Sequence, residues 1–223
     1  MSHYALITGA AGALGTVVSQ VFAAHGWELF LFDVSDERLK TNFPMAHTQS
    51  VDLTNFAAVQ AAVSALPHPP DAVLNLAGGF SMQIAEEATP EDVQYLMAIN
   101  FHTLFNTVTA VLPYMLERKS GFIAGVSAGA GLHGGAGMAL YSASKAAVWL
   151  YLRSLAQELK PSGIRVSTIF PMGAIDTPGN RVAMPRTDPK TWIDPHRIAE
   201  TLHFLATSDS RGHIQEVQIE VTG

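Results

Sequence analysis

The segment ALITGAAGALG, residues 5–15, decides the fold of this chain of 223 residues. Its first three residues are apolar, glycines follow at positions 9, 12 and 15, and a helical pattern then begins. Apolar side chains recur in that pattern at three- and four-residue spacing, at Leu14, Val17, Val18, Val21 and Phe22. The segment therefore predicts a buried strand, a tight glycine-rich turn and an amphipathic helix, in that order.

The same alternation of apolar runs and helical patterns continues along the chain. Further apolar runs occupy residues 29–32, 72–76, 122–126 and 165–170. They are continuous rather than alternating, which is typical of parallel strands covered on both faces. Helical spacing returns between them, most clearly over residues 93–111. We predict an α/β fold: a single domain over residues 1–223, with a Rossmann-type doubly wound parallel sheet and helices on both faces.

Composition narrows the class of protein. The hydrophobic content of 48% suffices for one sizeable core, and the absence of cysteine excludes disulfides and suits a reducing compartment. The first four residues lack the charged and apolar regions of a signal peptide, and no apolar stretch approaches the roughly 18 residues of a membrane span. We expect a cytoplasmic protein that does not bind membranes.

Charge and histidine spacing exclude two further kinds of partner. The net charge is −6, and the 13 basic residues are spread out rather than clustered, which argues against nucleic acid. The nine histidines show no H-E-x-x-H or other tight ligand spacing. We therefore predict no metal site.

The glycine-rich turn predicts a dinucleotide site. Glycines let the backbone approach a pyrophosphate, and free N–H groups at a helix N-terminus bind anions. Asp33 follows Gly15 by 18 residues and ends the second apolar run, where a carboxylate accepts hydrogen bonds from ribose hydroxyls and repels a 2′-phosphate. This favours NAD(H) over NADP(H), and no Arg or Lys lies in the turn or directly after Asp33. The alternative is that Asp33 only caps the next turn. The cofactor-binding residues predicted in the turn are Gly9, Ala11, Gly12, Leu14 and Gly15.

The segment YSASK, residues 141–145, predicts an acid/base pair. Tyr141 and Lys145 are four residues apart, so on a helix they share one face. An ammonium near a phenol lowers the phenol pKa toward neutrality, where proton transfer is most useful. The alternative, an exposed Tyr beside an exposed Lys, is common in proteins.

With the glycine turn, Asp33 and YSASK in this order, the whole chain resembles the short-chain dehydrogenase/reductase family. The resemblance implies that Asp52 and Leu53 contact adenine and that Asn100 belongs to the active site, in a proton relay near Lys145. It also implies cofactor contacts from the segment after the fourth strand and from a P-G-x-I-x-T-like segment, in which Met172 is an additional residue. The residues concerned are Asn75, Ala77, Gly78, Ile175 and Thr177, together with Tyr141 and Lys145.

One family feature is missing from this sequence. The family's site has a serine at the end of the fifth strand, which stabilises oxyanion charge on the substrate. Counting back from Tyr141 places Ala128 at that position. The neighbouring Ser127 would point to the opposite face unless the strand end bulges.

The missing serine coincides with a narrower resemblance, to the dihydropteridine reductases within this family. It rests on AGGF at residues 77–80 and on scattered identities over residues 176–195. The resemblance implies NADH-dependent reduction of a quinonoid dihydropteridine or related heterocycle. Such an imine-like ring needs a proton source more than a carbonyl-polarising donor, and Tyr141 can be that source.

Two further segments bear on function. Residues 171–195 hold five of the twelve prolines and are predicted to form a long irregular loop on the substrate side. The helix that begins near Tyr141 is apolar on nearly every side. We expect a homodimer or homotetramer through the helices containing Asn100 and Tyr141. The alternative is that this helix is buried within one domain.

Three hypotheses for function follow. The first is an NADH-dependent reductase of a pteridine-like small molecule. The second is a general carbonyl/alcohol oxidoreductase that recruits Ser127 through a bulged strand end. The third is a catalytically silent NAD-binding protein, against which the retained Tyr141 and Lys145 argue.

Overall fold

The computed structural model describes residues 3–35 and 37–222. Its seven strands form one parallel sheet in the order β3-β2-β1-β4-β5-β6-β7. The strands are β1 (His3–Thr8), β2 (Trp27–Asp33), β3 (His47–Ser50), β4 (Ala72–Asn75), β5 (Gly121–Val126), β6 (Ile164–Pro171) and β7 (Glu216–Ile219). The order reverses between β1 and β4, which is the switch point where open α/β sheets bind their ligands.

Helices connect the strands. The α-helices are α1 (Ala13–Ala24), α2 (Glu37–Asn42), α3 (Phe56–Ser64), α4 (Pro90–Met97), α5 (Thr103–Arg118), α6 (Gly129–His133), α7 (Ala139–Leu159), α8 (Pro178–Ala183) and α9 (Pro195–Thr207). The π-helical turn η2 (Ala98–His102) joins α4 to α5. Short 3-10 turns are η1 (Ala85–Glu87), η3 (Lys160–Ser162), η4 (Pro189–Thr191) and η5 (Ser210–Gly212).

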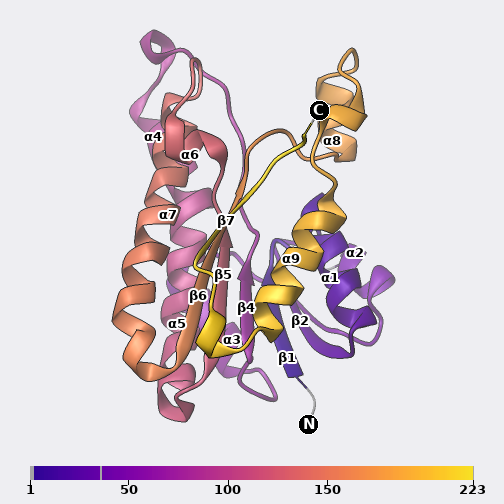
Figure 1. The fold of residues 1–223 in the computed structure, drawn as a ribbon, viewed down its shortest axis with the longest axis vertical. Coiled ribbons are helices and arrows are strands. Elements are labelled where there is room, and N and C mark those ends of the chain that lie inside the picture. The colour runs from indigo at the N-terminus through magenta and orange to yellow at the C-terminus, as the bar shows by residue number, and fades with distance from the viewer. Residues whose placement is uncertain (1–2, 36, 223) are drawn as a thin grey trace.

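Two hydrophobic cores lie on opposite faces of the sheet. One core contains Phe22 of α1, Leu39 of α2 and Leu202 of α9, and the other contains Met115 of α5 and Leu152 of α7. Figure 1 shows the same division, with α1, α2 and α9 on one side of the sheet and α5 and α7 on the other. The predicted doubly wound parallel sheet is confirmed. That residues 1–223 work as one domain stays a prediction, and Met1, Ser2, Asp36 and Gly223 lie outside the described residues.

The apolar pattern predicted the inner strands of the sheet but not the two edge strands, β3 and β7. Strands β1, β2, β4, β5 and β6 occupy the predicted runs, although β4 ends at Asn75, one residue earlier than predicted. The edge strands β3 and β7 read HTQS and EVQI, and none of their residues is buried. An edge strand has a neighbour on only one side, so it needs no continuous apolar run.

Residues 90–118 form one helical stretch of α4, η2 and α5, which contains the helical pattern predicted at residues 93–111. The stretch is long and apolar enough to cross a membrane by length and composition, but half of its apolar window is buried inside the protein. Core helices of soluble proteins pass the same test, so this is weak evidence for a span. The π turn within this stretch contains Asn100.

The segment 171–195 is more regular than the predicted loop. It contains α8 and η4, and its two ends are joined by a parallel bridge between Ile175 and Ile193. Ile193 and the preceding Trp192 are buried. Three of the five prolines behind the prediction, Pro178, Pro189 and Pro195, lie at helix starts, where the missing N–H costs nothing.

Candidate active site

The glycine-rich turn is built on close backbone contacts. Gly9 has φ +65°, and a Cβ there would lie 2.7 Å from the backbone nitrogen of Ala77. A Cβ on Gly15 would lie 2.1 Å from the carbonyl oxygen of Gly9. A larger residue at either position would separate the turn from α1 or from the chain after β4. These glycines therefore bring three backbone segments together at the switch point.

Asp33 at the end of β2 is hydrogen-bonded to the backbone of the glycine-rich turn. Its Oδ2 accepts a hydrogen bond from the Ala11 backbone N–H at 2.9 Å, and Oδ1 accepts one from Val34 at 2.8 Å. A carboxylate oxygen can accept more than one hydrogen bond. The carboxylate can thus fix the turn and still accept from a ligand hydroxyl.

A cavity of about 390 Å³ opens between these segments. Predicted residues that line it are Gly9, Ala11, Gly12, Asp33, Asp52, Leu53, Ala77 and Gly78. Lining residues that the sequence reasoning missed are Val34, Arg38, Thr54, Leu76, Gly79, Tyr95, Ile99 and Thr103. The lining combines a glycine turn, a helix N-terminus and an acid, which fits the phosphates and ribose of a dinucleotide.

Other predicted cofactor residues have structural contacts. Leu14 packs on the core beneath α1, and Asn75 is buried, with Nδ2 donating to the Ala124 carbonyl at 3.1 Å and Oδ1 without a hydrogen-bond partner. Ile175 accepts a hydrogen bond from the Asn180 side chain, and Thr177 caps α8. None of these four lines the cavity, and their cofactor contacts stay predictions.

Tyr141 and Lys145 lie together on the first two turns of α7. The Lys145 Nζ lies 6.0 Å from the centre of the Tyr141 ring and donates a hydrogen bond to the Val126 carbonyl at 3.0 Å. Burial lowers the pKa of Lys145 to about 8 and raises the pKa of Tyr141 to about 12. The expectation of a phenol pKa near neutrality is therefore wrong for this structure, because the loss of water outweighs the distant ammonium. Tyr141 is protonated at neutral pH, as a proton donor must be.

Asn100 forms hydrogen bonds both to α7 and to Gly79 of the cavity wall. Its Nδ2 donates to Ser144 Oγ at 3.0 Å and to the Gly79 carbonyl at 3.1 Å, and its Oδ1 accepts from the Gly79 N–H at 2.9 Å. Ser144 in turn donates to the Tyr141 carbonyl at 2.8 Å. A Cβ on Gly78 would lie 2.6 Å from Asn100 Oδ1 and 3.3 Å from Lys145 Nζ, so Gly78 of the cavity wall lies close to both side chains. Ser144 was missed because only the Tyr-Lys spacing was read in YSASK.

Ser127 makes its hydrogen bond to the backbone of α7. Its hydroxyl is buried and donates a hydrogen bond to the Lys145 backbone carbonyl at 2.8 Å. Ala128, the next residue, begins α6 as its N-cap. The Ser127 hydroxyl is therefore hydrogen-bonded to the backbone of α7 rather than to the Tyr141 phenol.

The cavity thus lies at the switch point of a parallel sheet and has a lining that fits a dinucleotide. Tyr141 and Lys145 do not line it themselves, but Lys145 Nζ lies close to Gly78 of its wall. This arrangement defines the class of nicotinamide-dependent oxidoreductases, in which a bound cofactor exchanges hydride with a substrate.

Comparison with known proteins gives the family. The family model for short chain dehydrogenases matches residues 3–187, and the chain belongs to the short-chain dehydrogenase/reductase family. Oxidoreductase UcpA of Salmonella typhimurium is 32% identical, covering 92% of this chain and 88% of that protein. The 3-oxoacyl-[acyl-carrier-protein] reductase FabG of Thermotoga maritima is 28% identical, covering 92% and 90%. The structure of a 3-oxoacyl-[acyl-carrier protein] reductase with bound NAD from Brucella melitensis has a TM-score of 0.86 at 25% identity, covering 97% and 89%. The chain is therefore an NAD(P)-dependent oxidoreductase, as predicted.

The buried ammonium leads to a prediction about stability. The pKa of Lys145 falls from 10.5 to about 8 on folding, so below pH 8 the folded state carries a charge that burial disfavours. At about 1.4 kcal/mol per pKa unit this costs roughly 3 kcal/mol, and the cost disappears as pH rises from 8 to 10.5. Lys145→Met should raise the free energy of unfolding at pH 7 by about 2 kcal/mol, after allowing about 1 kcal/mol for the lost hydrogen bond to Val126.

Urea unfolding of both proteins between pH 7 and 10.5 checks this prediction. The advantage of Lys145→Met should shrink steadily above pH 8. Lys160→Met is the matched control, because Lys160 is exposed at the far end of α7, and it should change little. A Lys145→Met protein that is destabilised equally at every pH contradicts the prediction.

Proposed function

We propose that this protein is an NADH-dependent reductase of a quinonoid dihydropteridine or a closely related planar heterocycle. The observation that carries the proposal is the hydrogen bond from Ser127 to the Lys145 carbonyl, next to Ala128 at the position of the usual serine. A carbonyl substrate gains from a hydroxyl that stabilises its developing oxyanion. An electron-poor imine-like ring gains less from that hydroxyl and depends on the proton donor.

Each residue at the site has a separate role in such a reduction. The cavity holds the cofactor, which supplies hydride when bound. Tyr141, protonated at neutral pH, donates the proton to the substrate ring nitrogen, and the Lys145 ammonium stabilises the phenolate left behind. Phe80 packs its ring edge-to-face on Tyr141 at 4.9 Å between centroids and is 60% exposed, so it offers an apolar wall for a flat substrate.

A carbonyl reductase is the second candidate. Two of the similar proteins are named 3-oxoacyl-[acyl-carrier-protein] reductases, which favours a ketone substrate for this chain as well. That function would require Ser127 to leave the Lys145 carbonyl and turn toward Tyr141. The two candidates therefore differ in how much activity depends on Ser127.

The test is NADH oxidation with chemically generated quinonoid dihydropterin and with a panel of ketones. We expect turnover of the dihydropterin, a loss of about 10²- to 10⁴-fold in Tyr141→Phe, and little change in Ser127→Ala. Tyr151→Phe, which removes a phenol from the same helix farther from the cavity, is the control and should stay active. NADH binding, followed by fluorescence, shows that each variant is folded.

Two outcomes would decide against the proposal. Efficient reduction of ketones without reduction of the dihydropterin, together with a large loss in Ser127→Ala, identifies a carbonyl reductase. Intact NADH binding without turnover of either substrate identifies a catalytically silent NAD-binding protein.

We propose that NAD(H) is preferred over NADP(H) because the Asp33 carboxylate lies in the cofactor cavity. Arg38 lines the same cavity and is the cation that the sequence reasoning overlooked. Asp33→Asn keeps one oxygen to accept from Ala11 but removes the charge that repels a 2′-phosphate. We expect kcat/KM for NADPH to rise about tenfold, equivalent to about 1.4 kcal/mol, and kcat/KM for NADH to fall.

The double variant Asp33→Asn/Arg38→Ala separates the two charges. It should lose the gain with NADPH, because no guanidinium is left in the cavity for the phosphate. A native protein that already uses NADPH better than NADH would overturn the role given to Asp33.

We further propose that a second copy of the chain covers α5 and α7. Phe101, Phe105 and Tyr151 form an aromatic cluster across η2, α5 and α7, with Phe105 41% and Leu150 60% exposed. Exposed apolar side chains that gather on one face mark interaction surfaces.

Phe105→Glu should shift the protein to the monomer, because a carboxylate would be buried at the interface without a partner. Light scattering after size-exclusion chromatography measures the mass. Phe56→Glu on α3, where Phe56 is 40% exposed, is the matched control and should leave the native mass unchanged. A native protein that is monomeric at micromolar concentration contradicts the proposal.

A further inference from the structure

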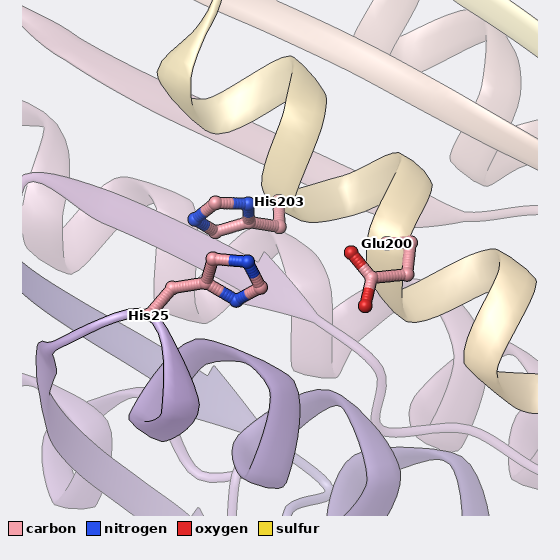
Figure 2. A group of neighbouring side chains, drawn as sticks. All are labelled: His25, Glu200 and His203. Carbon is pink, nitrogen blue, oxygen red and sulfur yellow. The ribbon is translucent and has the colours of Figure 1, made fainter.

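A cluster of possible metal ligands lies where the end of α1 meets α9, outside the active site. His25 follows α1 as its C-cap, and Glu200 and His203 are three residues apart on α9. One ligand atom from each lies within 4.8 Å of the others. Figure 2 shows the His25 and His203 rings over one another and the Glu200 carboxylate beside them.

His25 is oriented for coordination. Its Nδ1 lies 2.9 Å from the Val21 carbonyl oxygen, which can only accept a hydrogen bond, so Nδ1 carries the proton. In the neutral ring Nε2 then keeps its lone pair for a ligand. Metal-bound histidines are usually held in this way, with the other ring nitrogen donating to a carbonyl or carboxylate.

His203 is held by packing. Its ring stacks on His25 at 3.9 Å between centroids and meets the edge of Phe22 at 5.4 Å. Glu200 adds the negative charge that would offset a cation.

From this geometry we infer that His25, Glu200 and His203 bind one divalent transition-metal ion of the zinc class. Two imidazoles and one carboxylate suit zinc, with water as the fourth ligand. Bonds of about 2.0–2.2 Å place tetrahedral ligand atoms about 3.3–3.5 Å apart. Glu200 is exposed, so rotation of its side chain can bring a carboxylate oxygen closer to the two rings.

The site would be structural rather than catalytic. Helix α1 has 12 residues, about 18 Å at 1.5 Å per residue, and this length separates His25 from the glycine turn. Helices α1 and α9 pack on the face of the sheet opposite α7 and Tyr141. A metal here would join α1 to α9 and stabilise the folded state by binding it preferentially. The inference is independent of the proposed hydride transfer.

The sequence prediction of no metal relied on local ligand spacing. Glu200 and His203 match only a short E-x-x-H spacing, and the third ligand comes from the other end of the chain. The fold brings the three together through the packing of α1 on α9.

The experiment is titration of the metal-stripped, untagged full chain with ZnCl₂, using calorimetry for stoichiometry and thermal unfolding for stability. We expect one ion per chain and a rise in Tm with Zn²⁺ but not with Mg²⁺, which prefers octahedral oxygen ligands. His25→Ala, Glu200→Gln and His203→Gln should each weaken Zn²⁺ binding about tenfold or more. Co²⁺ in place of Zn²⁺ should give the visible spectrum of a tetrahedral site.

His196→Ala is the matched control, because His196 is exposed on the first turn of the same helix and outside the cluster. It should bind Zn²⁺ like the native protein. The inference is overturned if the native chain binds no ion at micromolar Zn²⁺, or if binding survives in His25→Ala and His203→Gln. Equal weakening in His196→Ala would show that surface histidines bind Zn²⁺ without a defined site.

Discussion

The close packing of α7 on the end of β5 is the constraint on which the active site depends. A Cβ on Gly125 would lie 2.7 Å from Leu152 Cδ1, and a Cβ on Gly131 would lie 2.9 Å from the Lys145 carbonyl carbon. Helix α7 can approach β5 at Gly125 and α6 at Gly131 this closely only because both positions are glycine. Lys145 consequently packs against the end of β5, where its ammonium donates a hydrogen bond to the Val126 carbonyl. Tyr141 lies one turn before Lys145 on the same face of α7.

This packing also explains the state of the ionisable groups. Both Tyr141 and Lys145 lose water, so the pKa of the phenol rises and the pKa of the ammonium falls, and each shift favours the neutral form. Charge attraction between them is too weak at their separation to reverse either effect. The chain keeps a costly buried ammonium in a fold that an apolar residue would stabilise. Such a cost is typical of functional sites.

The sequence predicts the inner parts of this molecule better than its edges. Buried strands need apolar residues along their whole length, so β1, β2, β4, β5 and β6 are visible as patterns. The glycine turn and the Tyr141-Lys145 pair are also local in sequence, so both are visible as short motifs. The orientation of Ser127 is not local, because it depends on how closely α7 approaches β5. The His25–Glu200–His203 cluster was missed for the same reason, because distant segments bring its side chains together. Arg38 follows Asp33 by only five residues and was missed because only the residues directly after Asp33 were considered.

Helix α9 links the segment 171–195 to α1. Its N-terminus follows the buried Trp192 and Ile193, so it anchors one end of the segment 171–195, while Arg165 of β6 donates to the carbonyls of Leu205 and Ala206 near its C-terminus. Between these ends α9 packs along α1, whose own N-terminus begins at the glycine turn. A change in how α9 packs on α1 would therefore affect both the glycine turn and the segment 171–195. A metal ion bound by His25, Glu200 and His203 would stabilise this helix contact, and through it the glycine turn, without contacting the cofactor or the substrate.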